Sequence, residues 1–393
     1  MFEILNYIFS VGIIFSHVIG YIVSIFAFLF IYKNWNNIKN NKIIIFAFAF
    51  LLYGFIRAYF CDYAKDAFDE MFTYLTSWLF PFILGYFIAD NYKKGKIIKI
   101  YILTFTIVII FSVLAYFGLF YERFLGAPLA LKGKLINANL WHISLGAMCV
   151  LLSSFSLNTL LFKKDLLKKE KIILGVLTVL FIVSLYLTSS RGYYIAGFIT
   201  YLCMFAFYVF TTKKFKIPAI LFCISFVIIS VLFFNSSYMQ DRIKNTNLTT
   251  DANVTSRIDS YKAAVLIFKN NFVFGVGPRQ GVKQAEFYAM TQPLKESRHQ
   301  IRHLHSMWLA VPAEFGIIGF VLFFAMIFLI LKNLYYEYKY NNSVFALCML
   351  FAWLSLLIGD CFDTVLRGPR VAMDYFWLTG LILAKSSNKT ETK

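Results

Sequence analysis

The stretch SMWLAVPAEFGIIGFVLFFAMIFLIL, residues 306–331, holds one charged side chain, Glu314, in 26 residues. A helix needs about 20 mostly apolar residues to cross the roughly 30 Å hydrocarbon core of a bilayer. The stretch therefore predicts a transmembrane helix, and the lone carboxyl inside it predicts a polar partner on another segment.

Comparable apolar runs fill most of the chain. The chain is 60% hydrophobic and 15% charged, whereas soluble domains are about 45–50% apolar and about 25% charged. We therefore predict an all-α, polytopic transmembrane helical bundle. The other runs lie at 43–60, 72–90, 100–120, 139–162, 172–188, 193–210, 217–235, 343–359 and 371–384.

The first apolar stretch, residues 3–32, is long for one helix. The interruption at Ser16-His17 and Gly20 favours two short helices joined by a tight turn, which gives about 12 spans with both termini on one side of the membrane. A single long helix would give about 11 spans. The predicted organisation is transmembrane helices in 1–235 (about eight or nine spans), a large hydrophilic loop in 236–305 with an amphipathic helix, and transmembrane helices with a tail in 306–393.

Lysine and arginine are sorted between alternate loops. One set of loops carries twenty lysines and no arginine, so the positive-inside rule predicts that this set faces the cytoplasm. The opposite set, 61–71, 121–138, 189–192, 236–305 and 360–370, should face outward. All ten arginines lie on or near the outward side: Arg57, Arg123, Arg191, Arg242, Arg257, Arg279, Arg298, Arg302, Arg367 and Arg370.

The arginines suggest an anionic substrate. Arginine grips phosphate with two parallel hydrogen bonds, whereas the alternative is that each arginine only anchors a helix end at the lipid headgroups. The formal net charge of +18 does not indicate nucleic acid, because it is spread over loops on both sides. The six cysteines have no metal-binding spacing, so we expect packing residues, with a Cys61–Cys361 disulfide as a minor alternative.

Two arginines are candidates for a phosphate site. Arg191 follows the short turn Thr188-Ser189-Ser190 directly and must lie at the membrane surface, where a charge requires a partner. Ser256 and Asp259 form a capping-box variant, which predicts a helix over 257–270 with Arg257 in its first turn. The free N–H groups of that turn favour an anion. The apolar face of this helix would be Ile258, Tyr261, Val265 and Phe268.

Three further segments of the outward side could contribute to a site. Gly275-Val276-Gly277-Pro278-Arg279 is more typical of a turn than of a phosphate loop and would expose Arg279. His299–Ser306 holds three histidines, but the nearby Arg298 and Arg302 disfavour a metal ion, so we expect no metal or cofactor. His305, at the mouth of a span, is suited to a proton acceptor, and Glu314 could polarise a histidine or stabilise an arginine. The remaining candidates for substrate contact are Arg57, His303, Arg302, Asp363 and Arg367.

Four segments together resemble the O-antigen ligase and polymerase superfamily of bacterial envelopes. They are SRG at 190–192, NVTSRIDSYKAA at 253–264, NNFVFGVGPR at 270–279 and HLHSMWLAVPAEFGIIG at 303–319. The resemblance implies a GT-C-like bundle in the bacterial inner membrane with a periplasmic site, and it puts Arg191, Arg257 and His305 on the family's essential positions. Ser306 stands where the family usually has Asn.

The resemblance also implies a function. The expected substrate is a glycan on undecaprenyl diphosphate, joined to lipid A–core without metal, cofactor or nucleic acid and with inversion at the sugar. One dominant outward loop favours a ligase, since polymerases tend to have two. A polymerase or a protein O-oligosaccharyltransferase of the same superfamily remains an alternative, and a flippase for the lipid-linked glycan is the alternative of another class.

Overall fold

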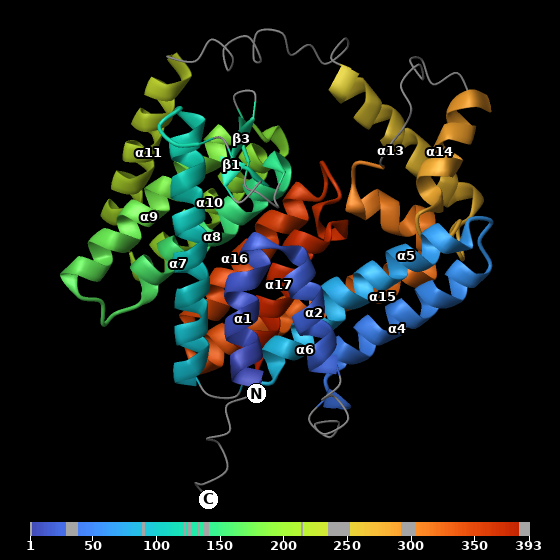
Figure 1. Ribbon diagram of the computed structural model, residues 1–393, viewed down its shortest axis with the longest axis horizontal. Coiled ribbons are helices and arrows are strands. Elements are labelled where there is room, and N and C mark those ends of the chain that lie inside the picture. Colours follow the sequence, from blue (N-terminus) through green and yellow to red (C-terminus); the bar gives the residue numbers. More distant parts are fainter. Residues whose placement is uncertain are drawn as a thin grey trace, which may run out of the picture.

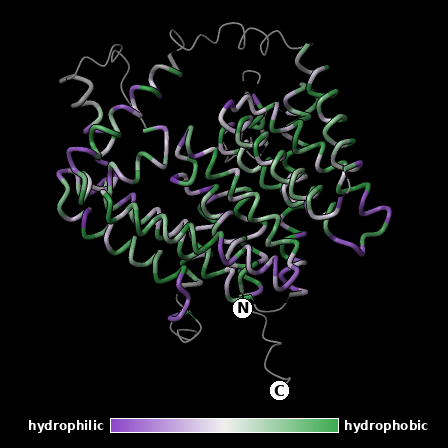
Figure 2. Tube along the Cα trace, turned by 180° about the vertical axis from the view of Figure 1, so that it is seen from behind, coloured by the Kyte–Doolittle hydropathy of each residue, from purple (hydrophilic) through white to green (hydrophobic). Residues whose placement is uncertain are grey.

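A computed structural model of the chain shows a bundle built almost entirely of helices (Figure 1). It describes residues 2–28, 38–88, 91–121, 123–124, 127–131, 134–136, 141–213, 215–234, 252–291 and 304–384. Hydrophobic residues dominate the helices, and hydrophilic residues concentrate at helix ends and in loops (Figure 2). This distribution is that of a membrane protein, so the all-α membrane class is confirmed.

The helices follow the predicted apolar runs in order. They are α1 (Phe2–Phe15), α2 (His17–Phe28), α4 (Lys42–Tyr59), α5 (Ala64–Tyr74) continued by the π-helical η2 (Leu75–Leu79) and α6 (Phe80–Tyr86), α7 (Asn91–Tyr116), α8 (His142–Phe162), α9 (Lys168–Leu187), α10 (Arg191–Thr212), α11 (Lys216–Phe234), α13 (Ala252–Asn270), α14 (Gln280–Thr291), α15 (Met307–Asn341), α16 (Val344–Gly359), the 3-10 helix η3 (Val365–Arg367) and α17 (Pro369–Leu383).

The first apolar stretch is a helix pair, as predicted. Ser16 separates α1 from α2, and its Oγ accepts a hydrogen bond from the N–H of Val18 at 3.2 Å. Six helices of the described residues are long and apolar enough to cross a membrane: Lys42–Tyr59, Tyr92–Tyr116, His142–Phe162, Lys168–Leu187, Arg191–Thr212 and Met307–Asn341. The full number of spans stays a prediction.

Two ends of the bundle can be told apart by their cations. Lys93 pairs with Glu3 of α1 at 2.7 Å, and Lys94 donates to the carbonyl of Ala384 just after α17. We call this the lysine end. The arginine end is the opposite one, with Arg57 in the last turn of α4 and Arg191 at the start of α10. The first and last helices thus begin and end on the same side, as predicted.

Helices α8 and α17 form the centre of the bundle. In α8, 83% of the residues in the most apolar 18-residue stretch are buried, whereas in the peripheral α10 the corresponding share is 33%. Helices α6 and α17 approach so closely at two glycines that a side chain would not fit. A Cβ at Gly85 would lie 2.3 Å from the carbonyl oxygen of Trp377, and a Cβ at Gly380 would lie 2.0 Å from the carbonyl oxygen of Phe82. Small residues allow such contact between membrane helices.

The long hydrophilic segment contributes two described helices, α13 and α14, which lie over the arginine end (Figure 1). They share a small core with the first turns of α15, made by Ala263, Ala264, Ile267, Ala285, Leu304, Ala310 and Ala313. The shorter segment at 121–138, which is predicted to face outward, holds two antiparallel strand pairs, β1 (Arg123–Phe124) with β2 (Ala127–Pro128) and β3 (Ala130–Leu131) with β4 (Lys134–Leu135).

Candidate active site

Four consecutive residues after α16 join the motifs that the sequence singled out. The backbone carbonyl of Asp360 accepts the N–H of Met307, two residues after His305, at 2.9 Å. The carbonyl of Cys361 accepts the hydroxyl of Tyr261 on α13 at 3.1 Å. The 360–363 segment, which we call the hub, therefore holds the start of α15 against α13.

The other two hub residues reach the two predicted phosphate arginines. The carboxylate of Asp363 lies 3.7 Å from the guanidinium of Arg257. Phe362 packs against Gly192, where a Cβ would come within 3.1 Å of the phenylalanine Cβ. Gly192 directly follows Arg191, so the hub brings the surroundings of Arg191, Arg257 and His305 together.

Arg191 is the first residue of α10, after a three-residue turn from α9, as predicted. Ser190 is the N-cap residue but its side chain makes no capping hydrogen bond, and Ser189 has a left-handed φ of 57°. A helix N-terminus favours anions through its N–H groups and its dipole. The helix-terminus argument made for Arg257 thus applies to Arg191.

The prediction for the start of the helix that carries Arg257 is wrong. Helix α13 begins at Ala252, so Ser256 lies inside the helix and Arg257 lies in its second turn. The side chain of Ser260 donates to the carbonyl of Arg257 at 2.8 Å, as hydroxyls inside helices do. A capping signal of this kind is weak on its own because it recurs by chance.

The prediction for the buried face of this helix is also wrong. Ile258 and Val265 are 41% and 39% exposed, whereas Ala263, Ala264 and Ile267 are fully buried. Helix α13 packs on its small residues because α14 and α15 approach it closely there. Tyr261 lies half-buried at the edge, where its hydroxyl reaches the hub.

His305 lies just before α15 and has a left-handed φ of 45°. Histidine adopts this region more readily than most residues, although still at a cost. Ser306 is the N-cap residue of α15 and is buried. The strained backbone is held because Met307 bonds to the hub and Leu304 is buried in the small core. Arg302 and His303 lie outside the described residues.

Helix α15 is broken at Gly316, whose φ of 62° and ψ of −168° are not helical. The turn at 272–277 fills the break with three backbone hydrogen bonds: Val276 N–H to Ala313 O at 3.1 Å, Gly277 N–H to Glu314 O at 2.7 Å and Ile317 N–H to Phe272 O at 2.8 Å. Polar backbone groups freed inside a membrane must find such partners. The glycine-rich motif is therefore a docking turn, as its sequence favoured.

Two of the weaker candidate arginines lie at this docking turn. Arg57 donates to the carbonyl of Gly275 at 2.9 Å and lies 5.8 Å from the ring centre of Phe274. These contacts favour a role for Arg57 in holding the turn over a contact with substrate. Arg279 is exposed at the end of the turn, with a left-handed φ of 60°, and stays a candidate.

Arg367 lies between two carboxylates. Its Nε is 2.5 Å from Glu70 of α5, and its two terminal nitrogens are 3.2 Å and 3.1 Å from the two oxygens of Glu314. The Glu314 side chain is 1% exposed, so Glu314 stabilises an arginine, one of the two expected roles. This placement favours a role for Arg367 in anchoring the 360–367 loop over the predicted contact with substrate. We call these three residues the ion triad.

Asp360 is the part of the hub that sequence reasoning missed. Its Oδ1 accepts the N–H groups of Val365 and Leu366 at 2.8 Å and 3.3 Å, which folds the loop between α16 and η3. Burial raises the pKa of the Asp360 carboxyl well above its usual range, although the two backbone hydrogen bonds act in the opposite direction. Glu70 was missed too, because an acid among the charged residues of 62–70 carries no sequence signal of burial.

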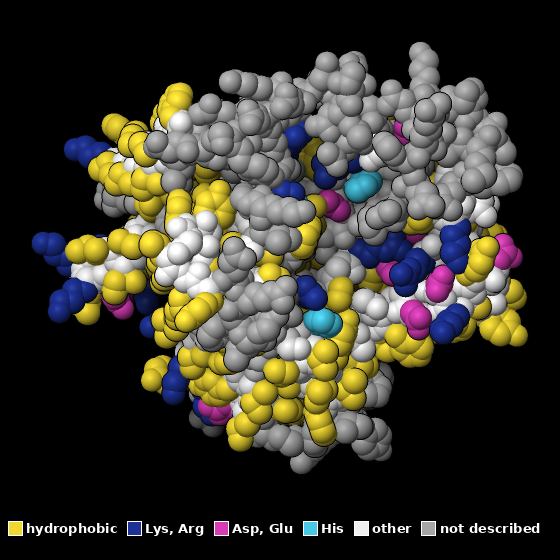
Figure 3. All heavy atoms as spheres, turned by 45° about the horizontal axis from the view of Figure 1, so that its top comes forward, with side chains coloured by type: hydrophobic (Ala, Val, Ile, Leu, Met, Phe, Trp, Pro, Cys, Tyr) yellow, Lys and Arg dark blue, Asp and Glu magenta, His cyan; other side chains and the backbone are white. Residues whose placement is uncertain are grey.

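The face of the arginine end is mixed in charge. Figure 3 shows basic side chains beside acidic ones and beside histidine on this face. Both free cysteines near it, Cys61 and Cys361, are thiols, so the minor disulfide alternative is wrong. The described contacts therefore bring Arg257, the start of α10 that carries Arg191 and the start of α15 that follows His305 to the same four-residue segment.

Residues 176–324 match the family model described as O-antigen ligase. The match confirms the expected resemblance to the O-antigen ligase and polymerase superfamily, and it includes Arg191, Arg257, Arg279 and His305. It does not include Arg57, Asp363 or either Glu70 or Arg367 of the ion triad. No curated protein matches the chain.

Proposed function

We propose that this chain, which carries an O-antigen ligase domain over residues 176–324, is an O-antigen ligase of the bacterial inner membrane. It transfers a glycan from undecaprenyl diphosphate to lipid A–core, at a site on the periplasmic side. The hub is the observation that supports this proposal most strongly. Three separate segments, which hold Arg191, Arg257 and His305, contact it.

Arg191 and Arg257 bind the diphosphate in this proposal. Diphosphate is a good leaving group, so catalysis requires mainly that its growing negative charge be stabilised. Preorganised cations in a site shielded from water provide that stabilisation, and removing one such donor typically costs about a hundredfold to a thousandfold in rate. Asp363, 3.7 Å from Arg257, keeps that guanidinium directed toward the hub before the diphosphate arrives.

His305 acts on the acceptor in this proposal. The acceptor hydroxyl oxygen attacks the anomeric carbon from the face opposite the diphosphate and forms the new glycosidic bond. The bond from that carbon to the phosphate oxygen breaks, and its electron pair leaves with undecaprenyl diphosphate. His305 takes the proton of the hydroxyl. Attack from the opposite face inverts the anomeric centre, and no step uses a metal or a nucleotide.

The direct test uses the purified chain with lipid-linked glycan and lipid A–core, in the absence of nucleotide and with chelator. We expect glycosylated lipid A–core as the product, detected by its slower electrophoretic migration and by mass. Extension of the lipid-linked glycan without use of lipid A–core would instead identify a polymerase. Glycan on a protein acceptor would identify an oligosaccharyltransferase, and movement of the lipid-linked glycan across a bilayer without transfer would identify a flippase.

The single large outward segment supports the ligase over the polymerase. The other outward segment of notable length, 121–138, holds only short two-residue strands among its described residues. It is also much shorter than 236–305, whereas a polymerase is expected to have two substantial outward loops.

A further inference from the structure

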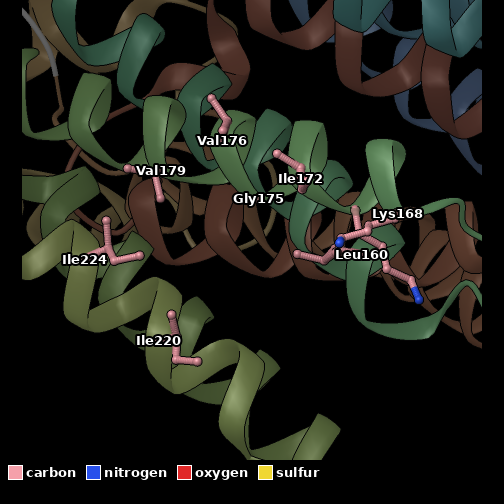
Figure 4. A pocket seen from close by; sticks show the side chains of 9 residues that line it. Leu160, Lys168, Ile172, Gly175, Val176, Val179, Ile220 and Ile224 are labelled. Carbon is pink, nitrogen blue, oxygen red and sulfur yellow. The ribbon is translucent and has the colours of Figure 1, made fainter.

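A groove runs along the outside of the bundle between α9 and α11, and Leu160 of α8 also lines it (Figure 4). Its volume is about 530 Å³, within the range of about 300–1,000 Å³ typical of ligand sites. Neither the hub residues nor Arg191, Arg257 or His305 line it, so the groove is distinct from the proposed active site.

The wall on α9 is a single helical stripe. Lys168, Lys171, Ile172, Gly175, Val176 and Val179 all line the groove. Their spacing of three and four residues places them on one face of the helix. Gly175 has no side chain, so the stripe is hollowed at its middle. Thr178, three residues after Gly175, ties α9 to α8 through its hydrogen bond to Ser156 at 3.0 Å.

The groove opens outward along most of its length. Ile172 and Val176 are 59% and 62% exposed, and Ile220 on the facing helix α11 is 56% exposed. In a bilayer these side chains face lipid tails, so the natural occupant of the apolar part is a hydrocarbon chain. Figure 4 shows Ile220 and Ile224 of α11 facing the α9 wall across the opening.

Charge is confined to one end of the groove. Lys168 is the first residue of α9, and Lys171 lies one turn further along, both exposed at the lysine end. Two cations at the mouth of an apolar groove, at the level where a helix leaves the membrane, match an anionic headgroup joined to acyl chains. Basic pockets between transmembrane helices on the cytoplasmic side bind such lipids.

We propose that this groove binds a phospholipid with an anionic headgroup, with an acyl chain along Ile172, Val176 and Ile220 and the phosphate at Lys168 and Lys171. The site is independent of the proposed transfer reaction. Because the headgroup is recognised by charge, binding weakens as ionic strength rises.

Native mass spectrometry of the full-length protein, purified in a neutral detergent, tests the proposal. The probes are phosphatidylglycerol and phosphatidylcholine with the same acyl chains, titrated against the protein. Phosphatidylglycerol should bind more tightly. The double substitution Lys168→Gln/Lys171→Gln should weaken its binding about thirtyfold, at about 1 kcal/mol for each lysine, and should leave phosphatidylcholine binding unchanged.

Two further variants make the test specific. Lys163→Gln/Lys164→Gln removes two lysines from the same loop that do not line the groove, and should change binding less than about threefold. Gly175→Phe fills the hollow and should weaken both lipids, with thermal unfolding used to verify the fold. Equal loss in the two lysine pairs, or no loss in the groove pair, would overturn the proposal. So would tighter, groove-dependent binding of a polyprenyl phosphate than of phosphatidylglycerol.

Discussion

At the arginine end, two arginines are held by carboxylates from distant parts of the chain, whereas most described lysines of the lysine end are exposed. Arg257 lies against Asp363 and Arg367 between Glu70 and Glu314. By contrast, the side chains of the Lys93–Glu3 pair are 44% and 36% exposed. Lysines that only set the orientation of the protein need no fixed geometry, whereas Arg257 in the proposed site and Arg367 in the loop anchor are each held by named carboxylates.

The largest effect should follow from removing a group proposed to touch substrate. Arg191→Ala and His305→Ala should each lower transfer to lipid A–core by at least about a hundredfold, while the amount of protein in the membrane stays the same. Lys164→Ala at the lysine end is the matched control and should transfer glycan normally. Normal transfer by either variant would show that the substituted residue has no catalytic role and would contradict the proposed active site.

The ion triad and the Lys93–Glu3 pair allow the two ends to be compared by their contribution to the free energy of unfolding. Arg367→Met leaves two carboxylates buried without a cation and should lower the free energy of unfolding by about 3–5 kcal/mol. Lys93→Met breaks the exposed pair and should cost at most about 1 kcal/mol. Thermal unfolding in detergent measures both.

A rescue experiment distinguishes charge from packing at the triad. Adding Glu70→Gln and Glu314→Gln to Arg367→Met removes the uncompensated charges, so the triple variant should recover much of the lost stability. If the triple variant is no more stable than Arg367→Met, packing of the side chain and not its charge is what matters.

A methyl group at two glycines should act in opposite directions. At Gly316 a Cβ would lie 2.2 Å from the carbonyl oxygen of Val273, and the backbone φ is left-handed. Gly316→Ala should therefore lower the free energy of unfolding by about 1–3 kcal/mol, and the rate of glycan transfer should fall as well. At Gly95, in α7, the nearest side-chain atom would lie 3.8 Å away. Gly95→Ala should raise stability by about 0.5–1 kcal/mol, measured by the same unfolding assay.

The smallest effect should come from a single hydrogen bond to the hub. Tyr261→Phe removes the bond to the Cys361 carbonyl and should cost about 0.5–1.5 kcal/mol, seen as a modest fall in transfer rate. Tyr340→Phe, at an exposed position of α15, is the control and should change neither rate nor stability. An effect of Tyr261→Phe as large as that of Arg191→Ala would mean that the hydroxyl itself meets substrate.

The sequence predicted the helices and the gathering of arginines well, because hydropathy and charge act over whole segments. Ser16 marked the turn between α1 and α2 in the same way, since a polar residue interrupts an apolar run. The start of α13 was not predictable from Ser256 and Asp259, because a capping pattern is a local signal that several positions satisfy and tertiary packing chooses between them.

The break at Gly316 was hidden for a different reason. The apolar run at 316–319 is typical of a transmembrane helix, and hydropathy does not indicate the backbone φ of a residue. The partner that stabilises the break lies some 40 residues earlier, at Phe272–Gly277. The ion triad was predictable only in part. The lone Glu314 in an apolar run predicted a polar partner, but no local pattern in the sequence indicates that Arg367 and Glu70 lie beside it.

The break in α15 also has a consequence for biogenesis. The docking turn precedes α15 in the chain, so the groups that complete the broken helix are synthesised before the helix itself. A chain that delivered α15 without that turn would expose the carbonyls of Ala313 and Glu314 to lipid. The broken helix is thus complete only when the docking turn lies against it.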